Sequence, residues 1–197
     1  MSTVYTGSAA LACLASGTAV SGFTFENADL SSLRLAGRDL TGATFLRCRA
    51  PGVEASGALL KTSTWIECDL SGMRLGKADL SGTTLHACSL AGSDLTEARL
   101  ANTVLVEITW GGTVLRRAQL DALSLDGVNL DGLDLREASL SDCSLVGACA
   151  TTLALPRCTV VRCSFQSARL GPVDFTGADL TGSSFTLAQV PRGRFAG

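Results

Sequence analysis

Large apolar residues recur at every fifth position along almost the whole chain. From Val20 to Phe195, all 36 positions whose number is a multiple of five are apolar: 22 Leu, six Phe, two Trp, three Val and three Ala. We call each of these positions a centre. A period of five matches neither the 3.6 residues of an α-helix nor the alternation of a β-strand. Because the spacing never changes, the pattern indicates one uninterrupted array of short extended segments joined by corners.

The residue two places before a centre is usually small. At 28 of the 36 sites it is Ala, Cys, Ser, Thr, Val or Gly. One large and one small inward residue in every five fit a chain that winds around a narrow axis. Seventeen of the 21 glycines lie two places after a multiple of five, where a type II turn needs a positive φ. The pattern therefore predicts such turns at the corners.

The segment Ala78-Asp79-Leu80-Ser81-Gly82, which recurs at residues 178–182 with Thr in place of Ser, resembles the repeat of the pentapeptide-repeat family, Ala-(Asp/Asn)-Leu-x-x. The resemblance extends from about residue 18 to the end. It implies an all-β fold, a right-handed quadrilateral parallel β-helix with four repeats per coil, about nine coils and no projecting loops. With about 4.8 Å between stacked strands, such a rod is about 43 Å long.

The two ends of the array carry separate expectations. Residues 1–17 keep the period only weakly, so they form either a degenerate first coil or an N-terminal cap on the β-helix of residues 18–197. At the other end, a last coil with Phe185, Val190 and Phe195 presents an apolar cross-section and an unpaired β edge. Uncovered edges invite pairing, so we expect a homodimer that forms end to end through the C-terminal coil.

Composition and charge disfavour several classes of function. The 197 residues include 16 Lys and Arg against 18 Asp and Glu, for a formal net charge of −2. Basic residues are few and interleaved with acidic ones, which argues against direct binding of nucleic acid. No apolar run reaches the roughly 18 residues of a membrane span, and no basic residue precedes the apolar stretch at 9–15, as a signal peptide requires. We expect a cytoplasmic protein.

The eight cysteines are interpreted as small core residues. Seven of them occupy the small inward position, and Cys149 is the exception. There is no CxxC pair, and His86, the one histidine, cannot complete a zinc site. We therefore expect buried thiols in a reducing compartment, with no metal and no cofactor.

Three sets of outward residues stand out from the pattern. The first, the charge ladder, alternates in sign and predicts stacked ion pairs that hold the register: Lys77, Glu97, Arg117, Glu137 and Arg157. The second, the apolar column, is a candidate partner surface: Leu46, Ile66, His86, Val104, Val106 and Val146. The third, the acidic belt, is offset within residues 121–142 only by Arg136: Asp121, Asp126, Asp131, Asp134, Glu137 and Asp142. The belt suits a basic partner, but aspartates also favour turns and keep a rod soluble.

The residues favour a non-enzymatic function. There is no paired set of carboxylates, no nucleophile with a base and no phosphate-binding loop. We expect a protein–protein interaction or scaffold module. The family resemblance implies an alternative, since Qnr-type quinolone-resistance proteins mimic duplex DNA and bind DNA gyrase. On that hypothesis this chain is a DNA-mimicking gyrase- or topoisomerase-binding protein that gives resistance to quinolones or gyrase toxins. The net charge of −2 and the unbroken register weigh against it.

Overall fold

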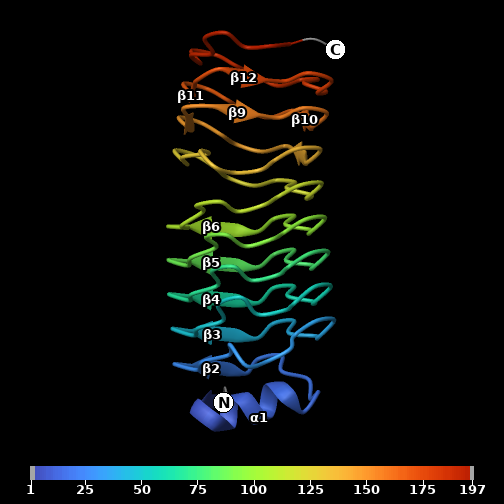
Figure 1. The fold of residues 1–197 in the computed structure, drawn as a ribbon, viewed down its shortest axis with the longest axis vertical. Helices are drawn as coiled ribbons and strands as arrows, with labels where there is room; N and C mark the ends of the chain where they lie inside the picture. Colours follow the sequence, from blue (N-terminus) through green and yellow to red (C-terminus); the bar gives the residue numbers. More distant parts are fainter. Residues whose placement is uncertain (1–2, 196–197) are drawn as a thin grey trace.

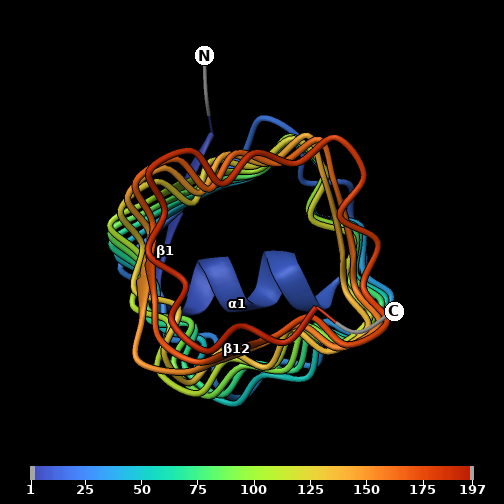
Figure 2. The same ribbon diagram turned by 90° about the horizontal axis from the view of Figure 1, so that it is seen from above.

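Each turn of the chain takes 20 residues and lies directly on the turn before it. In a computed structural model, which describes residues 3–195, strands and isolated bridges pair in parallel with a constant offset of 20, as in Val4↔Thr24 and Asp29↔Arg49. About nine such coils stack into a rod (Figure 1) with a square outline in end view (Figure 2). The predicted parallel β-solenoid is confirmed.

The strands are short and belong to four faces. The longest sheet covers the face we call face 1 and has six parallel strands: β1 (Val4–Thr6), β2 (Thr24–Glu26), β3 (Thr44–Leu46), β4 (Thr64–Ile66), β5 (Thr84–His86) and β6 (Val104–Val106). Three two-stranded pairs follow in the C-terminal half. They are β7 (Ser139–Ser141) with β10 (Thr159–Val161), β8 (Cys149–Ala150) with β11 (Arg169–Leu170), and β9 (Leu153–Ala154) with β12 (Val173–Asp174).

The centres fill the axis of the rod. Leu100 and Leu140 have no exposed surface, and Phe45 stacks on Trp65 with ring centroids 3.8 Å apart. Small polar residues at the other inward position hydrogen-bond to the coil below. For example, the Thr83 hydroxyl donates to the carbonyl of Leu60 at 2.7 Å. A buried hydroxyl or thiol needs an acceptor. Because this contact supplies one, Ser, Thr and Cys can occupy the inward position that holds Ala in other repeats.

Corner geometry follows the glycine pattern. Every residue with a positive φ among those described lies two places after a multiple of five, and 18 of them are not glycine. At most corners the centre carbonyl accepts the N–H three residues on, as in Phe23 to Val20 at 2.9 Å. The aspartate of the repeat supports the corner as well, because Asp179 Oδ1 accepts the backbone N–H of Thr181 at 2.9 Å and its hydroxyl at 2.5 Å.

The N-terminal residues both extend the sheet and cover its end. Strand β1 pairs in register with β2, and helix α1 (Gly7–Ala15) then crosses the open end of the rod (Figures 1 and 2). Ala10 and Leu14 of the helix are buried against the core. Periodicity alone left a degenerate coil and a cap as alternatives and did not predict a helix.

All eight cysteines are free thiols, and six are buried, while Cys13 and Cys149 are partly exposed. The buried thiols donate to backbone carbonyls, as Cys88 does to Trp65 at 3.4 Å. Burial raises the pKa of Cys158 to about 11, so this thiol stays protonated at neutral pH. None of the described helices has the length and apolar character needed to cross a membrane.

Candidate protein-interaction surfaces

The apolar column lies on face 1. Strand pairing places Leu46, Ile66, His86 and Val106 side by side on consecutive coils. The first three are half-buried, whereas Val106 is 42% exposed, and Val104 beside it is 49% exposed. The apolar surface is therefore most accessible at the upper end of the sheet, on β6.

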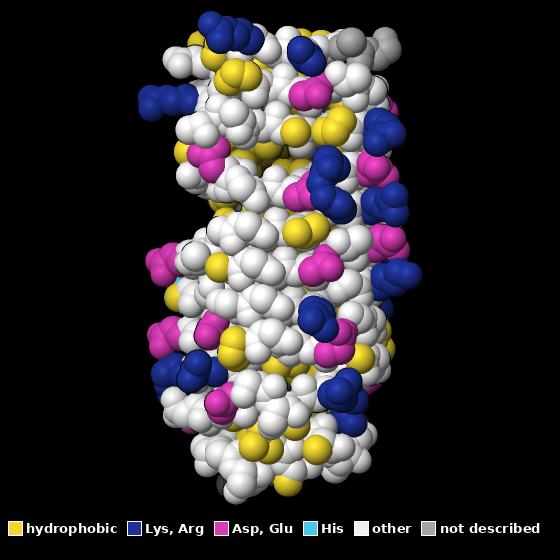
Figure 3. All heavy atoms as spheres, in the orientation of Figure 1, with side chains coloured by type: hydrophobic (Ala, Val, Ile, Leu, Met, Phe, Trp, Pro, Cys, Tyr) yellow, Lys and Arg dark blue, Asp and Glu magenta, His cyan; other side chains and the backbone are white. Residues whose placement is uncertain are grey.

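Directly beyond β6 the stack opens sideways. On two adjacent faces, no backbone hydrogen bond or bridge joins residues 103–112 to residues 124–132 in the part of the chain that the structure describes. On the other two faces the same coils stay paired, through the bridges Val114↔Asp134 and Gln119↔Ser139. We call the resulting opening the lateral cleft. The space-filling outline is indented at this level (Figure 3).

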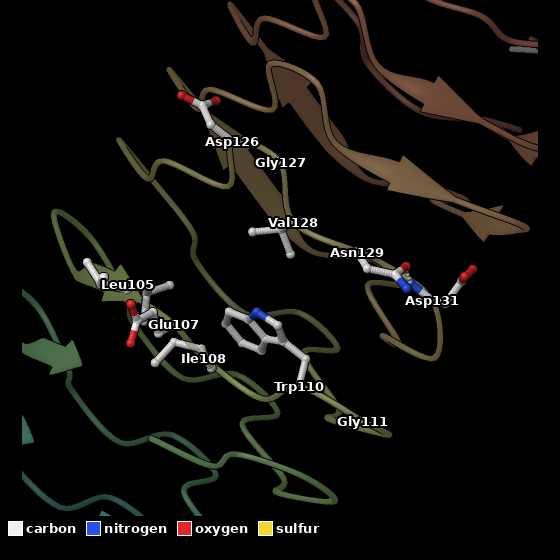
Figure 4. A pocket seen from close by; sticks show the side chains of 11 residues that line it. Leu105, Glu107, Ile108, Trp110, Gly111, Asp126, Gly127, Val128, Asn129 and Asp131 are labelled. Atoms are coloured by element: carbon white, nitrogen blue, oxygen red, sulfur yellow. Dashed lines mark hydrogen bonds between the residues drawn. The ribbon is translucent and has the colours of Figure 1, made fainter. Parts of the chain in front are cut away.

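The cleft reaches the core and has an acidic rim. It encloses about 620 Å³, and its apolar lining includes Leu105, Ile108, Trp110 and Val128. Figure 4 shows Ile108 and Trp110 on one coil facing Val128 on the next. The rim carries carboxylates and the lining includes no Lys or Arg; the carboxylates belong to Glu107, Asp126 and Asp131.

Two of these carboxylates are held in place by the coil above. Asp126 accepts the backbone N–H of Val146 at 2.8 Å, and Asp131 accepts the backbone N–H of Thr151 at 2.7 Å. The N–H and hydroxyl of Thr151 lower the pKa of Asp131. A carboxylate that accepts such bonds stays ionised at neutral pH. Asp131 therefore contributes a negative charge to the rim.

Half of the acidic belt is compensated by arginines, most of which come from adjacent coils. Asp134 pairs with Arg116 and Arg136, and Asp142 pairs with Arg162 at 2.6 Å. Glu137 belongs to the charge ladder, whose predicted ion pairs are confirmed. Successive N···O distances in that ladder are 3.7 Å for Lys77–Glu97, 3.7 Å for Glu97–Arg117, 2.9 Å for Arg117–Glu137 and 3.4 Å for Glu137–Arg157.

The remaining belt residues act locally. Asp121 lies 3.5 Å from the hydroxyl of Ser139, and Asp126 and Asp131 support the coil above and form part of the cleft rim. Basic and acidic side chains are intermixed over the face drawn in Figure 3. At the cleft, the belt residues Asp126 and Asp131 lie among lining residues that include no Lys or Arg.

The last coil that the structure describes exposes apolar side chains. Phe185 stacks on Phe165 with centroids 4.7 Å apart, and Phe195 lies 5.4 Å from Phe175. Phe195 is 57% exposed, and Phe185 and Val190 are only partly buried. The three residues of the expected dimer end thus lie together in the uppermost coil of the described chain.

No arrangement suited to a metal was found: within residues 3–195, no group of three His, Cys, Asp or Glu residues is placed to hold an ion. Sequence reasoning did not identify Leu105, Ile108, Trp110 and Val128 as residues that line a cleft, because all four occupy inward positions of the repeat. The available signal was Val104, which replaces the threonine found at the same place on the four preceding strands.

A filled four-sided solenoid of five-residue units is the fold class that these features define. The sequence profile of the pentapeptide repeats matches eight copies at residues 66–105, 93–132, 113–151 and 161–192. The chain belongs to the pentapeptide-repeat family.

Two solved structures of QnrB1 share the fold of this chain. Full-length QnrB1, described as a plasmid-mediated fluoroquinolone resistance protein, is similar with a TM-score of 0.67 and 20% identity over 96% of this chain and 94% of that one. A trypsin-treated variant of QnrB1 gives a TM-score of 0.63, 20% identity and coverage of 96% and 92%. HetL, from the cyanobacterium Nostoc, is 24% identical over 87% of this chain and 86% of that one, with a TM-score of 0.32. No curated protein sequence matches the chain.

Proposed function

We propose that this protein is a non-enzymatic interaction module that binds another protein through face 1 of the rod. The observation that carries the proposal is the part of the apolar column on β3–β6, which reaches the exposed Val104 and Val106 beside the lateral cleft. Aligned apolar side chains that reach an opening in the core are typical of protein-binding surfaces. The filled interior elsewhere leaves the outer faces as the surfaces for recognition.

The test compares two matched charge substitutions. Val106→Glu changes the exposed end of the column, whereas Gln119→Glu introduces a carboxylate on a different face of nearly the same coil. Partners captured from the native host by the unchanged protein should be lost with Val106→Glu and retained with Gln119→Glu. Equal retention by both variants would exclude face 1 as the binding surface.

Gyrase binding is the second candidate function. The rod dimensions favour it, because about 43 Å of stacked coils match the length of about 13 base pairs of duplex, at one phosphate charge per 1.7 Å. The ion pairs that compensate Asp134, Glu137 and Asp142 weigh against a DNA-like charge distribution. Supercoiling by DNA gyrase, measured with and without a fluoroquinolone, is the test. An unchanged reaction at tens of micromolar protein would remove this candidate.

Self-association through the C-terminal coil is a further part of the proposal. It is supported by the exposure of Phe195 and the partial burial of Phe185 and Val190. Light scattering should then give twice the monomer mass, and Phe195→Asp should return the monomer. A monomer at micromolar concentration of the unchanged protein would contradict it. The free thiols favour a reducing compartment such as the cytoplasm.

A further inference from the structure

We propose that the lateral cleft binds an extended peptide segment of a partner, with basic and apolar residues in alternation, which adds as a β-strand to the edge that follows β6. This inference deepens the proposed function, on which it rests, by assigning a mode of recognition and a peptide chemistry to the open end of face 1. It depends on three properties of the cleft: unpaired backbone, an apolar floor and an acidic rim.

The unpaired backbone supplies the hydrogen bonds. One coil below, Leu90 N–H donates to the carbonyl of Thr109 at 2.8 Å, and one coil above, Leu130 N–H donates to the carbonyl of Cys149 at 2.8 Å. The equivalent bond from Trp110 to Asn129 does not form within the described chain. Unpaired edges of this kind are templates for an added strand.

The edge available to a peptide has defined limits. At one end Asn102 N–H still donates to the carbonyl of Asp121 at 3.0 Å, and at the other Asp134 N–H donates to the carbonyl of Thr113 at 3.2 Å. These two bonds mark where backbone pairing between the coils resumes, so the open edge comprises residues 103–112. A segment of this length suits a short peptide strand and not a whole domain.

The apolar floor supplies specificity for alternate side chains. Leu105 and Ile108 are only partly buried, although equivalent inward residues on the coil below, Leu85 and Cys88, are almost fully buried. Trp110 retains 8% exposure on the cleft floor. Because side chains of a strand alternate between two faces, every second residue of the peptide would enter the cleft, and an aliphatic residue fits there.

The rim selects the remaining residues by charge. Glu107, Asp126 and Asp131 are among the lining residues, which include no Lys or Arg, and the carboxylates of Asp126 and Asp131 are turned toward the coil above. The side chain of Glu107 is 72% exposed, and its nearest ion-pair partner, His86, lies 4.0 Å away. Lysine or arginine side chains that point out of the cleft would meet these carboxylates, whereas acidic peptides would be repelled.

The binding experiment uses a defined probe. A fluorescein-labelled heptapeptide of alternating lysine and valine is titrated with the full chain, with polarisation of the label and the combined fluorescence of Trp65 and Trp110 as readouts. The same peptide with glutamate in place of lysine is the charge control. We expect the lysine peptide to bind at least about tenfold more tightly than the glutamate peptide, a difference of 1.4 kcal/mol. Equal binding of the two peptides would overturn the assigned chemistry.

Strand addition is tested by two further measurements. N-methylation of alternate peptide residues removes the donors along one side of the strand, so at least one of the two alternate sets should abolish binding. Hydrogen exchange at Leu105, Glu107 and Trp110 should slow in the complex because their N–H groups become paired. If neither methylated set weakens binding, or exchange at all three amides is unchanged, the peptide does not add as a strand.

Matched protein variants locate the site. Glu107→Lys reverses a rim charge and should weaken binding of the lysine peptide by about fivefold. Glu67→Lys changes the equivalent corner two coils below and should leave it unaltered. Equal affinities of the two variants would place the peptide elsewhere. The two proposals can fail separately. If Val106→Glu abolishes partner capture but Glu107→Lys does not, face 1 is still the binding surface and the cleft is excluded as the binding site.

Discussion

Replacing Gly171 by alanine tests the closest approach between two coils. Gly171 follows β11, and a Cβ atom placed on it would lie 1.9 Å from the carbonyl oxygen of Thr151 and 2.6 Å from its carbonyl carbon. Both atoms belong to the backbone of the coil below, so no side-chain rotation relieves the overlap. The two coils would have to separate by about 1 Å, in an interior packed as densely as an organic crystal.

The cost follows from the contacts that this separation disturbs. The Gly171 N–H donates to the carbonyl of Ala150 at 2.7 Å, and losing that bond costs about 1 kcal/mol. Overpacking adds about 1–3 kcal/mol, so we expect Gly171→Ala to lower the free energy of unfolding by about 2–4 kcal/mol. Urea unfolding followed by far-UV circular dichroism measures this loss.

Gly76→Ala is the matched control. Gly76 occupies the same place, one residue after a centre, but its nearest neighbour to a new Cβ is 3.7 Å away, an ordinary contact. Alanine there should leave stability unchanged or raise it by up to about 1 kcal/mol, because it restricts the unfolded chain. If the free energies of unfolding of the two variants differ by less than about 0.5 kcal/mol, the close approach at Gly171 is refuted.

Four other predictions follow from the core, the corners and the titratable groups. Leu80→Arg should abolish the folded circular dichroism signal, because burying an unpaired charge costs several kcal/mol, while Leu80→Met should fold. Thr62→Gly should raise the melting temperature, since a β-branched residue at φ 51° pays about 1–2 kcal/mol for the left-handed region; a lower value contradicts this. Hydrogen bonds from Ser71 lower the pKa of Asp69, so their contribution to stability is present above about pH 4 and is lost as the pH falls below it. Between pH 7 and pH 3, the free energy of unfolding of Asp69→Asn should therefore fall by less than that of the unchanged protein. Native protein should react rapidly with a thiol reagent at only the two partly exposed cysteines, because the six others, Cys158 included, are buried; three or more fast thiols would contradict the packing.

The sequence was informative about the core because each coil repeats the same local choice. A leucine every fifth residue and a small residue two places before it leave few alternatives for which side chains face inward. The ion pairs of the charge ladder were predictable for the same reason, since residues 20 apart must be neighbours once the coil length is known. The aspartate of the repeat follows a local rule as well, because it bonds an N–H only two residues further along the chain.

Features outside the repeat, and contacts that depend on more than one coil, were less predictable. Helix α1 lies in the segment where the period fades, and its burial depends on the apolar end of the rod that it covers. The acidic belt appeared nearly uncompensated along residues 121–142, yet Arg116 and Arg162 come from the preceding and following coils. Charge compensation between coils is a property of the stack and is not visible in a linear segment.

By itself the sequence determined the period and the direction of almost every inward side chain, because these depend on a pattern repeated in each coil. The stacking offset of 20 was implied by the family resemblance. Only the tertiary structure decided where two coils separate. Residues 103–112 and 124–132 keep the five-residue spacing of their neighbours, although Ile108 occupies a position that is usually small and Val104 replaces a threonine, but pairing on two faces is lost while pairing on the other two persists. The physical reason is that a solenoid is stabilised by contacts between adjacent coils, and whether a particular pair closes depends on the combined packing of both, here around Trp110, Ile108 and Val128.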